Sequence, residues 1–323
     1  MVRAICLFVA AMLASGASLA QGTYPAKSVK VIVPQAAGGS SDLMARVFSE
    51  ALTEALGQSF VVENKTGAGG TIGAASVATS PPDGYTLLMV DQSFVLAPNL
   101  YKTVPYDLLK DFTPISDMGQ IPAALVVNPE LGIKTLAEFI AYCKANPGKL
   151  NYGSGGVGSA VHLATEFFAR SAGCQLTHVP FSGGGGPMMS AVVGNHVQMV
   201  LTAVPTVASF VQSGKLVALA VTTDDGKRSS TLPNVPSMGE AGLKNATLYF
   251  WYGLSGPANM PKDVVNAVHA GMRKAVANPK VKEKLEKSSA ELSANGPDAF
   301  GKLLAQEQAK WATVIRAAGI KPE

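Results

Sequence analysis

The sequence predicts an α/β fold of two lobes, each with a mostly parallel sheet flanked by helices. Three observations support this prediction. Apolar, β-branched runs alternate with amphipathic segments, which is typical of βαβ units and parallel sheets. The 323 residues are enough for two lobes, and the two halves of the chain look alike. Hydrophobic residues make up 47% and charged residues 15% of the chain, which argues against disorder.

The first half contains three predicted strands, with a helix after each of the first two. The strands cover 29–33, 60–63 and 85–90, and the helices cover 40–56 and 70–79. Aliphatic residues from Leu43 to Leu56 share one face of the first helix. We expect Ser40 or Ser41 to cap its start and Gly57 to end it.

The second half repeats this alternation and then becomes mostly helical. Strands are predicted at 124–128, 150–153, 177–180, 197–201 and 216–222. Helices are predicted at 135–145, 159–172, 187–194, 204–213, 262–277, 279–288 and 297–318. Crossovers between the lobes are expected near 112–120 and 224–236, with a third near 249–257. The first lobe would then comprise 21–118 and 228–323, and the second lobe 119–227.

The N-terminus has the features of a secretory signal peptide over residues 1–20. Arg3 supplies the positive charge, residues 4–14 are apolar, and Ser18-Leu19-Ala20 places small residues at a cleavage site. The apolar run is too short to span a bilayer. We therefore expect cleavage after Ala20 and a soluble, periplasmic protein.

Cysteine, histidine and charge patterns restrict the function. The mature chain keeps Cys143 and Cys174, which could form a disulfide after export or remain buried thiols. The four His and three Cys are too few and too dispersed for a metal framework. The net charge of +4 is spread along the chain, which argues against nucleic-acid binding. We expect no metal, no cofactor and a monomer.

Four glycine-rich turns precede predicted helices and carry the functional signal. They cover 34–42, 67–71, 153–159 and 181–187. Each places backbone N–H groups at a helix N-terminus, which favours anions, although such a turn often serves only as a tight connection. Two turns fall in each predicted lobe, so a cleft between the lobes would direct both sets toward one small anion. The turns contain neither a P-loop nor a GxGxxG motif.

Catalysis has one weak candidate. Ser159 and His162 lie on the same early helical turn and could form a nucleophile–base pair in an exported hydrolase. The sequence has no GxSxG elbow and no evident acid to orient the histidine, so a capping or packing role for His162 is the simpler interpretation.

A series of short motifs runs along nearly the whole mature chain. They are Val33-Pro34, Ala37-Gly38-Gly39 with Asp42 and Ala45-Arg46, Val62-Glu63-Asn64-Lys65, Gly67-Ala68-Gly69-Gly70, Pro82-Asp83-Gly84-Tyr85, Asn146-Pro147-Gly148-Lys149, Asn151-Tyr152-Gly153-Ser154, His162-Leu163, His178-Val179-Pro180-Phe181, Ala220-Val221-Thr222 and Pro233-Asn234-Val235-Pro236. These motifs resemble those of one receptor family, the Bug-type solute-binding proteins of tripartite tricarboxylate transporters.

The resemblance implies a periplasmic Venus-flytrap receptor. Such a protein would capture a small carboxylated organic solute between its lobes and deliver it to a membrane permease with a small and a large subunit; coupling to a sensor kinase is an alternative. Family members hold a carboxylate with loop amides and bridging water. The candidate ligand-binding residues transferred by position are Gln35, Gly38, Gly39, Ser40 and Asp42 of the first turn, Ser154, Ser159 and His162 of the third, and Phe181, Ser182 and Gly183 of the fourth. Gly67 of the second turn joins them.

Two departures from the family pattern lie at expected cleft loops. Thr202, in Leu201-Thr202-Ala203, replaces part of a Phe-containing stretch, and Asp91 stands where the resemblance predicts a small polar residue. A carboxylate at position 91 would repel an anionic ligand. Asp91 would therefore pair with a protein cation such as Arg46 or Lys65, or else meet an ammonium or another donor on the ligand.

Overall fold

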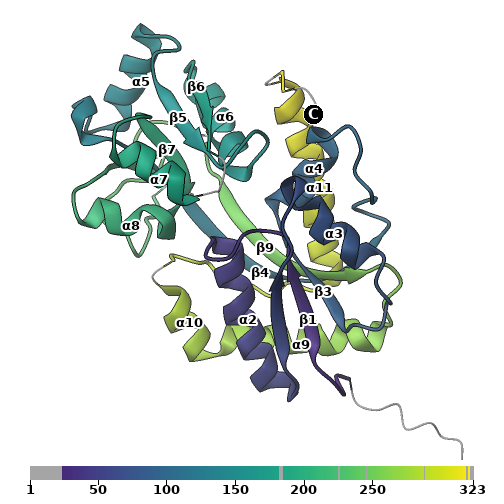
Figure 1. Cartoon of the computed structure of the whole chain (residues 1–323). Helices are drawn as coiled ribbons and strands as arrows, with labels where there is room; N and C mark the ends of the chain where they lie inside the picture. Colours follow the sequence, from purple (N-terminus) through teal and green to yellow (C-terminus); the bar gives the residue numbers. More distant parts are fainter. Residues whose placement is uncertain are drawn as a thin grey trace, which may run out of the picture.

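The computed structural model describes residues 24–181, 185–224, 226–244, 246–286, 288–317 and 319–320. The predicted signal peptide and its cleavage site lie outside these residues. Two groups of helices and strands lie one above the other and are connected by the long strands β4 (Phe112–Val127) and β9 (Tyr249–Pro257) (Figure 1). The predicted α/β class is confirmed.

The first sheet has the strand order β2-β1-β3-β9-β4. Its parallel part consists of β1 (Val29–Val33), β2 (Phe60–Asn64) and β3 (Thr86–Asp91). Strand β9 runs antiparallel to both β3 and β4. The sheet is therefore mixed rather than mostly parallel, because the two strands that connect the groups run in opposite directions.

The second sheet continues from the end of β4. Residues 123–127 of this strand pair antiparallel with β7 (Met199–Ala203) on one side and with β8 (Val217–Val221) on the other. Strand β5 (Asn151–Ser154) lies parallel to β7 and to β6 (Thr177–Pro180). This sheet is also mixed, since β4 enters it against the direction of its neighbours.

The predicted crossover near 112–120 is a strand with two register shifts rather than a loop. Gly119 lies at the second shift with φ +113°. A Cβ atom at this position would lie 2.2 Å from the carbonyl oxygen of Glu291, so only glycine fits. The adjacent Gln120 exchanges two backbone hydrogen bonds with Glu291, at 2.8 and 2.9 Å. The lobe boundaries at 118/119 and 227/228 stay predictions.

Helices cover both sheets (Figure 1). Their bounds are α2 (Ser40–Leu56), α3 (Thr71–Ala78), α4 (Gln92–Leu100), α5 (Leu136–Ala145), α6 (Ala160–Ala172), α7 (Gly185–Val193), α8 (Val204–Gln212), α9 (Lys262–Ala277), α10 (Pro279–Glu286) and α11 (Pro297–Ala317), with short 3₁₀ turns η1 (Ala68–Gly70) and η2 (Pro129–Leu131). Helix α4 was not predicted from the sequence, because it is short and contains Pro98.

The start of α2 corrects one prediction. The N-cap is Gly39, without a side-chain cap, and neither Ser40 nor Ser41 has that role. Both serines lie inside the first turn and their hydroxyls are hydrogen-bonded elsewhere. Gly57 ends the helix in the left-handed conformation, as predicted.

The two mature cysteines are free thiols in this structure. Cys143 is buried and Cys174 is half-buried. Burial, followed by a hydrogen bond with Cys143, raises the pKa of the Cys174 thiol to about 12. The buried-thiol alternative therefore describes this state of the chain.

Candidate functional site

A pocket of about 100 Å³ is lined by elements of both sheets. One wall comes from helices α2 and α4 and strands β3 and β9 of the first group. The other wall comes from α6, β7 and α8 of the second group. The lining residues are Ser40, Ser41, Asp91, Gln92, Phe250, Trp251 and Tyr252 on the first wall, and Ala160, Val161, Thr202, Ala203 and Thr206 on the second wall.

Four helices begin at this pocket. The first-turn residues Ser40 of α2, Gln92 of α4, Ala160 of α6 and Thr206 of α8 all line it. Unpaired backbone N–H groups and the positive ends of the helix dipoles occur at such positions. Among the described residues, none of the lining side chains is basic. The arrangement can therefore attract an anion through backbone dipoles, without a cationic side chain.

The two serines of α2 connect the helix to the first wall. The hydroxyl of Tyr252, on β9, donates to Ser40 Oγ at 2.8 Å. The hydroxyl of Ser41 donates to Asp91 Oδ2 at 2.6 Å. These hydrogen bonds fix the start of α2 against β3 and β9, so the first wall is held in place before any ligand arrives.

Asp91 is the last residue of β3 and the N-cap of α4. Its Oδ1 accepts a hydrogen bond from the backbone N–H of Ser93 at 2.9 Å. The side chain is 9% exposed, and burial raises its pKa, while the hydrogen bonds from Ser41 and Ser93 oppose this effect.

The expected pairing of Asp91 with Arg46 or Lys65 is wrong. The ion pairs among the described residues do not include Asp91. Arg46 instead pairs with Asp42 at 2.9 Å and also donates to the side chain of Asn64. Asp42 lies in the first turn and Asn64 on β2, so the guanidinium of Arg46 already has two partners away from Asp91.

Asp42 supports the first turn from outside the pocket. Its carboxylate accepts hydrogen bonds from Gly38 N, Arg46 Nε and Asn64 Nδ2 at 2.9–3.0 Å. Burial acts to raise the pKa of Asp42, but these hydrogen bonds outweigh it and hold the pKa below its usual value. The side chain of Asn64 also donates to Gln35 O. Asp42 therefore shapes the loop and lies away from the lining.

The third turn rests on a stack of aromatic rings. The rings of His162 and His178 are 4.0 Å apart at 12°, and Tyr152 lies 5.0 Å from His178. His162 Nδ1 accepts the backbone N–H of Gly158 at 2.9 Å, and Ser154 Oγ lies 2.6 Å from His178 Nε2. Burial lowers the pKa of both histidines to about 4, so both rings are neutral at pH 7.

This geometry leaves the hydrolase interpretation without support. Ser159 is the N-cap of α6, and its hydroxyl accepts the backbone N–H of His162 at 3.2 Å. The histidine ring is directed to Gly158 instead. The serine that does contact a histidine ring is Ser154, which is fully buried and out of reach of a substrate.

Of the candidate residues from the sequence, Ser40, Asp91 and Thr202 line the pocket. Candidates that lie outside its lining are Gln35, Gly38, Gly39, Asp42, Gly67, Ser154, Ser159, His162 and Phe181, and Ser182 and Gly183 lie outside the described residues. The first and third turns reach the pocket through the helices that follow them.

The pocket residues on β9 and α8 were not identified from the sequence. Trp251 and Tyr252 on β9 and Thr206 on α8 line the pocket but were not among the candidates from the sequence. Glu307, on α11, accepts hydrogen bonds from both Trp251 Nε1 and Trp311 Nε1, at 3.0 and 2.8 Å. This carboxylate fixes the Trp251 indole at the pocket wall.

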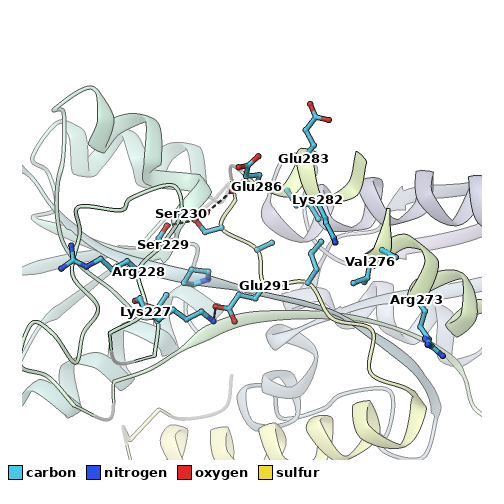
Figure 2. A pocket seen from close by; sticks show the side chains of 17 residues that line it. Lys227, Arg228, Ser229, Ser230, Arg273, Val276, Lys282, Glu283, Glu286 and Glu291 are labelled. Atoms are coloured by element: carbon cyan, nitrogen blue, oxygen red, sulfur yellow. Dashed lines mark hydrogen bonds and ion pairs between the residues drawn. The ribbon is translucent and has the colours of Figure 1, made fainter. Parts of the chain in front are cut away.

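A larger groove of about 830 Å³ lies near the end of α10 (Figure 2). Its charged side chains carry both signs. Lys227 forms an ion pair with Glu291, Lys282 and Arg273 lie nearby, and Glu286 lines the groove as well. The mixed charge and open shape distinguish this groove from the small pocket.

Within the residues that the structure describes, no group of His, Cys, Asp and Glu side chains could hold a metal ion. None of the helices in the same residues is long and apolar enough to cross a membrane.

Solved structures with the same architecture define the class of this protein. "R. palustris Rpa4515 with adipate" has a TM-score of 0.85 and 31% identity, covering 93% of this chain and 100% of that chain. The periplasmic binding protein BugD has a TM-score of 0.82 and 33% identity, over 93% and 100% of the two chains. "MatC (Rpa3494) from Rhodopseudomonas palustris with bound malate" has a TM-score of 0.80 and 30% identity, over 90% and 100%. The fold is that of the two-lobed periplasmic binding proteins.

Sequence comparison gives the family. Residues 44–320 match the family model described as "Tripartite tricarboxylate transporter family receptor". "Protein BugT" of Bordetella pertussis is 36% identical over 307 residues, which is 94% of this chain and 93% of BugT. The chain belongs to the tripartite tricarboxylate transporter receptor family, which confirms the resemblance described above.

Proposed function

We propose that this protein is a periplasmic receptor that captures a small carboxylated solute and delivers it to a membrane permease. The observation that carries the proposal is the convergence of four helix N-termini on one pocket without a basic lining side chain. A carboxylate is the anion that such a site accommodates, and relatives of the same fold are described with adipate and malate.

The mechanism that we propose is closure of the two lobes on the solute. Each wall of the pocket comes from a different group of elements, so a ligand that contacts both walls binds more tightly when the walls approach. The closed state would then be recognised by the permease, with its small and large subunits. The signal peptide would direct export and be removed by cleavage after Ala20.

The test places a carboxylate in the pocket. Thr206 lies in the first turn of α8 and lines the pocket, and a glutamate there is favourable for the helix itself. Thr206→Glu should weaken binding of an anionic ligand at least tenfold. The matched control is Ser209→Glu, an exposed position later in the same helix.

Binding would be measured by a thermal-shift screen of mono-, di- and tricarboxylates, followed by calorimetry on the acids that stabilise the protein. A ligand present at about 100 times its Kd should add about 2.7 kcal/mol to the free energy of unfolding. Equal affinities for Thr206→Glu, Ser209→Glu and the wild type would contradict the placement of the anion. A complete lack of carboxylate binding would contradict the receptor function.

A further inference from the structure

The first wall of the pocket contains a buried carboxylate that the protein itself does not neutralise. Asp91 lines the pocket, is 9% exposed, and accepts hydrogen bonds from Ser41 and from the backbone of Ser93. In the described part of the chain, no basic residue pairs with it and none lines the pocket. A buried charge of this kind ordinarily has a partner of opposite sign.

Asp91 also changes what the four helix N-termini can bind. As the N-cap of α4, its carboxylate accepts the backbone N–H of Ser93 and offsets the positive end of the helix dipole. The helices α6 and α8 on the opposite wall begin at Ser159 and Ala203, which are uncharged. The pocket therefore attracts negative charge on the second wall and positive charge beside Asp91.

The hydrogen bonds to Asp91 leave room for another donor. A carboxylate has about four acceptor positions on its two oxygens. Ser41 uses one position on Oδ2, the amide of Ser93 uses one on Oδ1, and the side chain of Ser93 also hydrogen-bonds to the carboxylate, which leaves about one position. Since Asp91 lines the pocket, this position faces a ligand bound there.

We propose that the ligand is a small amino acid whose ammonium group binds Asp91 while its carboxylate meets the helix N-termini of the second wall. The inference rests on the proposed receptor function and narrows its solute class. The pocket volume of about 100 Å³ is consistent with a small solute, since pockets for drug-sized ligands measure about 300–1,000 Å³.

The experiment uses pairs of acids that differ only in the amino group: aspartate and succinate, glutamate and glutarate, alanine and propionate. Calorimetry on the mature protein at pH 7 should give at least one pair in which the amino acid binds at least tenfold more tightly. Asp91→Asn should remove that preference. The affinity for the amino acid should fall at least tenfold, and the affinity for its partner acid should change less than threefold.

Two further variants keep the result interpretable. Asparagine and serine both cap helices well, so Asp91→Asn and Asp91→Ser should preserve α4, and circular dichroism would check this. The matched control is Asp263→Asn, an exposed carboxylate in the first turn of α9, which should leave every affinity unchanged.

Three outcomes separate the possibilities. If no acid of either kind binds, the receptor function itself fails. If plain acids bind as tightly as their amino partners, and Asp91→Asn changes the two affinities equally, the ammonium contact is wrong while the receptor function stands. If plain acids bind with proton uptake, seen as enthalpies that depend on the buffer, Asp91 binds them as a neutral acid and the proposal is overturned.

Discussion

The imidazole stack beneath the third turn should make the protein sensitive to acid. His162 is 5% exposed, and burial lowers its pKa from 6.5 to about 4. Burial, and then the neighbouring His162, lowers the pKa of His178 to about 4 as well. The unfolded chain therefore takes up protons on these rings below pH 6.5, while the native protein resists until about pH 4. Stability must fall as the pH drops through this interval.

The magnitude follows from the shift. A change from 6.5 to about 4 at His162 corresponds to about 3 kcal/mol between the protonation states. His178 is only half-buried, and solvent screening reduces its contribution to about 1–2 kcal/mol. His178→Phe keeps an aromatic ring in the stack and removes one titrating group. Ser154 retains its hydrogen bonds with Gly156 in this variant.

Urea unfolding at pH 7 and pH 4.5 measures the effect. The wild type should lose about 1–2 kcal/mol more than His178→Phe between these two pH values, because the two proteins share every titrating group except this imidazole. His196→Gln is the control, since His196 takes no part in the stack. An identical pH dependence of stability in the wild type and His178→Phe would show that burial in the stack does not lower the pKa of His178.

Three further predictions concern the connection between the sheets, the tryptophan and the first turn. Gly119→Ala should cost at least about 2 kcal/mol in urea unfolding, because φ is +113° and a Cβ would lie 2.2 Å from a backbone oxygen. Gly132→Ala, with φ +72° and open space around the Cβ, should cost less. Glu307→Ala should shift the fluorescence of Trp251 and Trp311, since both indoles lose an acceptor, and should weaken ligand binding several-fold in calorimetry because Trp251 lines the pocket. Asp42→Asn removes the charged acceptor of the hydrogen bonds from Gly38, Arg46 and Asn64, so it should lower stability by about 1–2 kcal/mol at neutral pH. This difference should vanish in acid, because the pKa of Asp42 lies below its usual value and the wild-type carboxylate is itself protonated there.

Local patterns allowed most helices and strands to be predicted from the sequence. The bounds of α2 follow from its apolar face and from Gly57, and the start of α5 follows from Thr135, whose side chain caps the helix. The directions of β4 and β9 could not be predicted from local patterns, because these strands pair through residues more than 100 positions apart in the sequence. Helix α4 was missed because it is short and contains Pro98, and because Asp91 was considered only as an ion-pair or ligand contact and not as a helix cap.

The candidate site was predictable only where it depends on loop chemistry. Glycine-rich turns pointed to the starts of α2 and α6, whose first residues line the pocket. The hydrogen bond from Tyr252 to Ser40 joins residues 212 positions apart, and no local signal marks it. Thr206 likewise reaches the pocket only because β4 places the second sheet opposite the first.

The two walls of the pocket differ in a way that bears on the closure proposed above. On the first wall, Ser40 and Ser41 already have partners in Tyr252 and Asp91. On the second wall, the hydroxyl of Thr202 has no hydrogen-bond partner among the described residues, although the side chain is 5% exposed. A ligand held on the ordered first wall would offer an acceptor to this hydroxyl. Because that hydrogen bond would form only when the second wall approaches, it would favour the closed state over the open one.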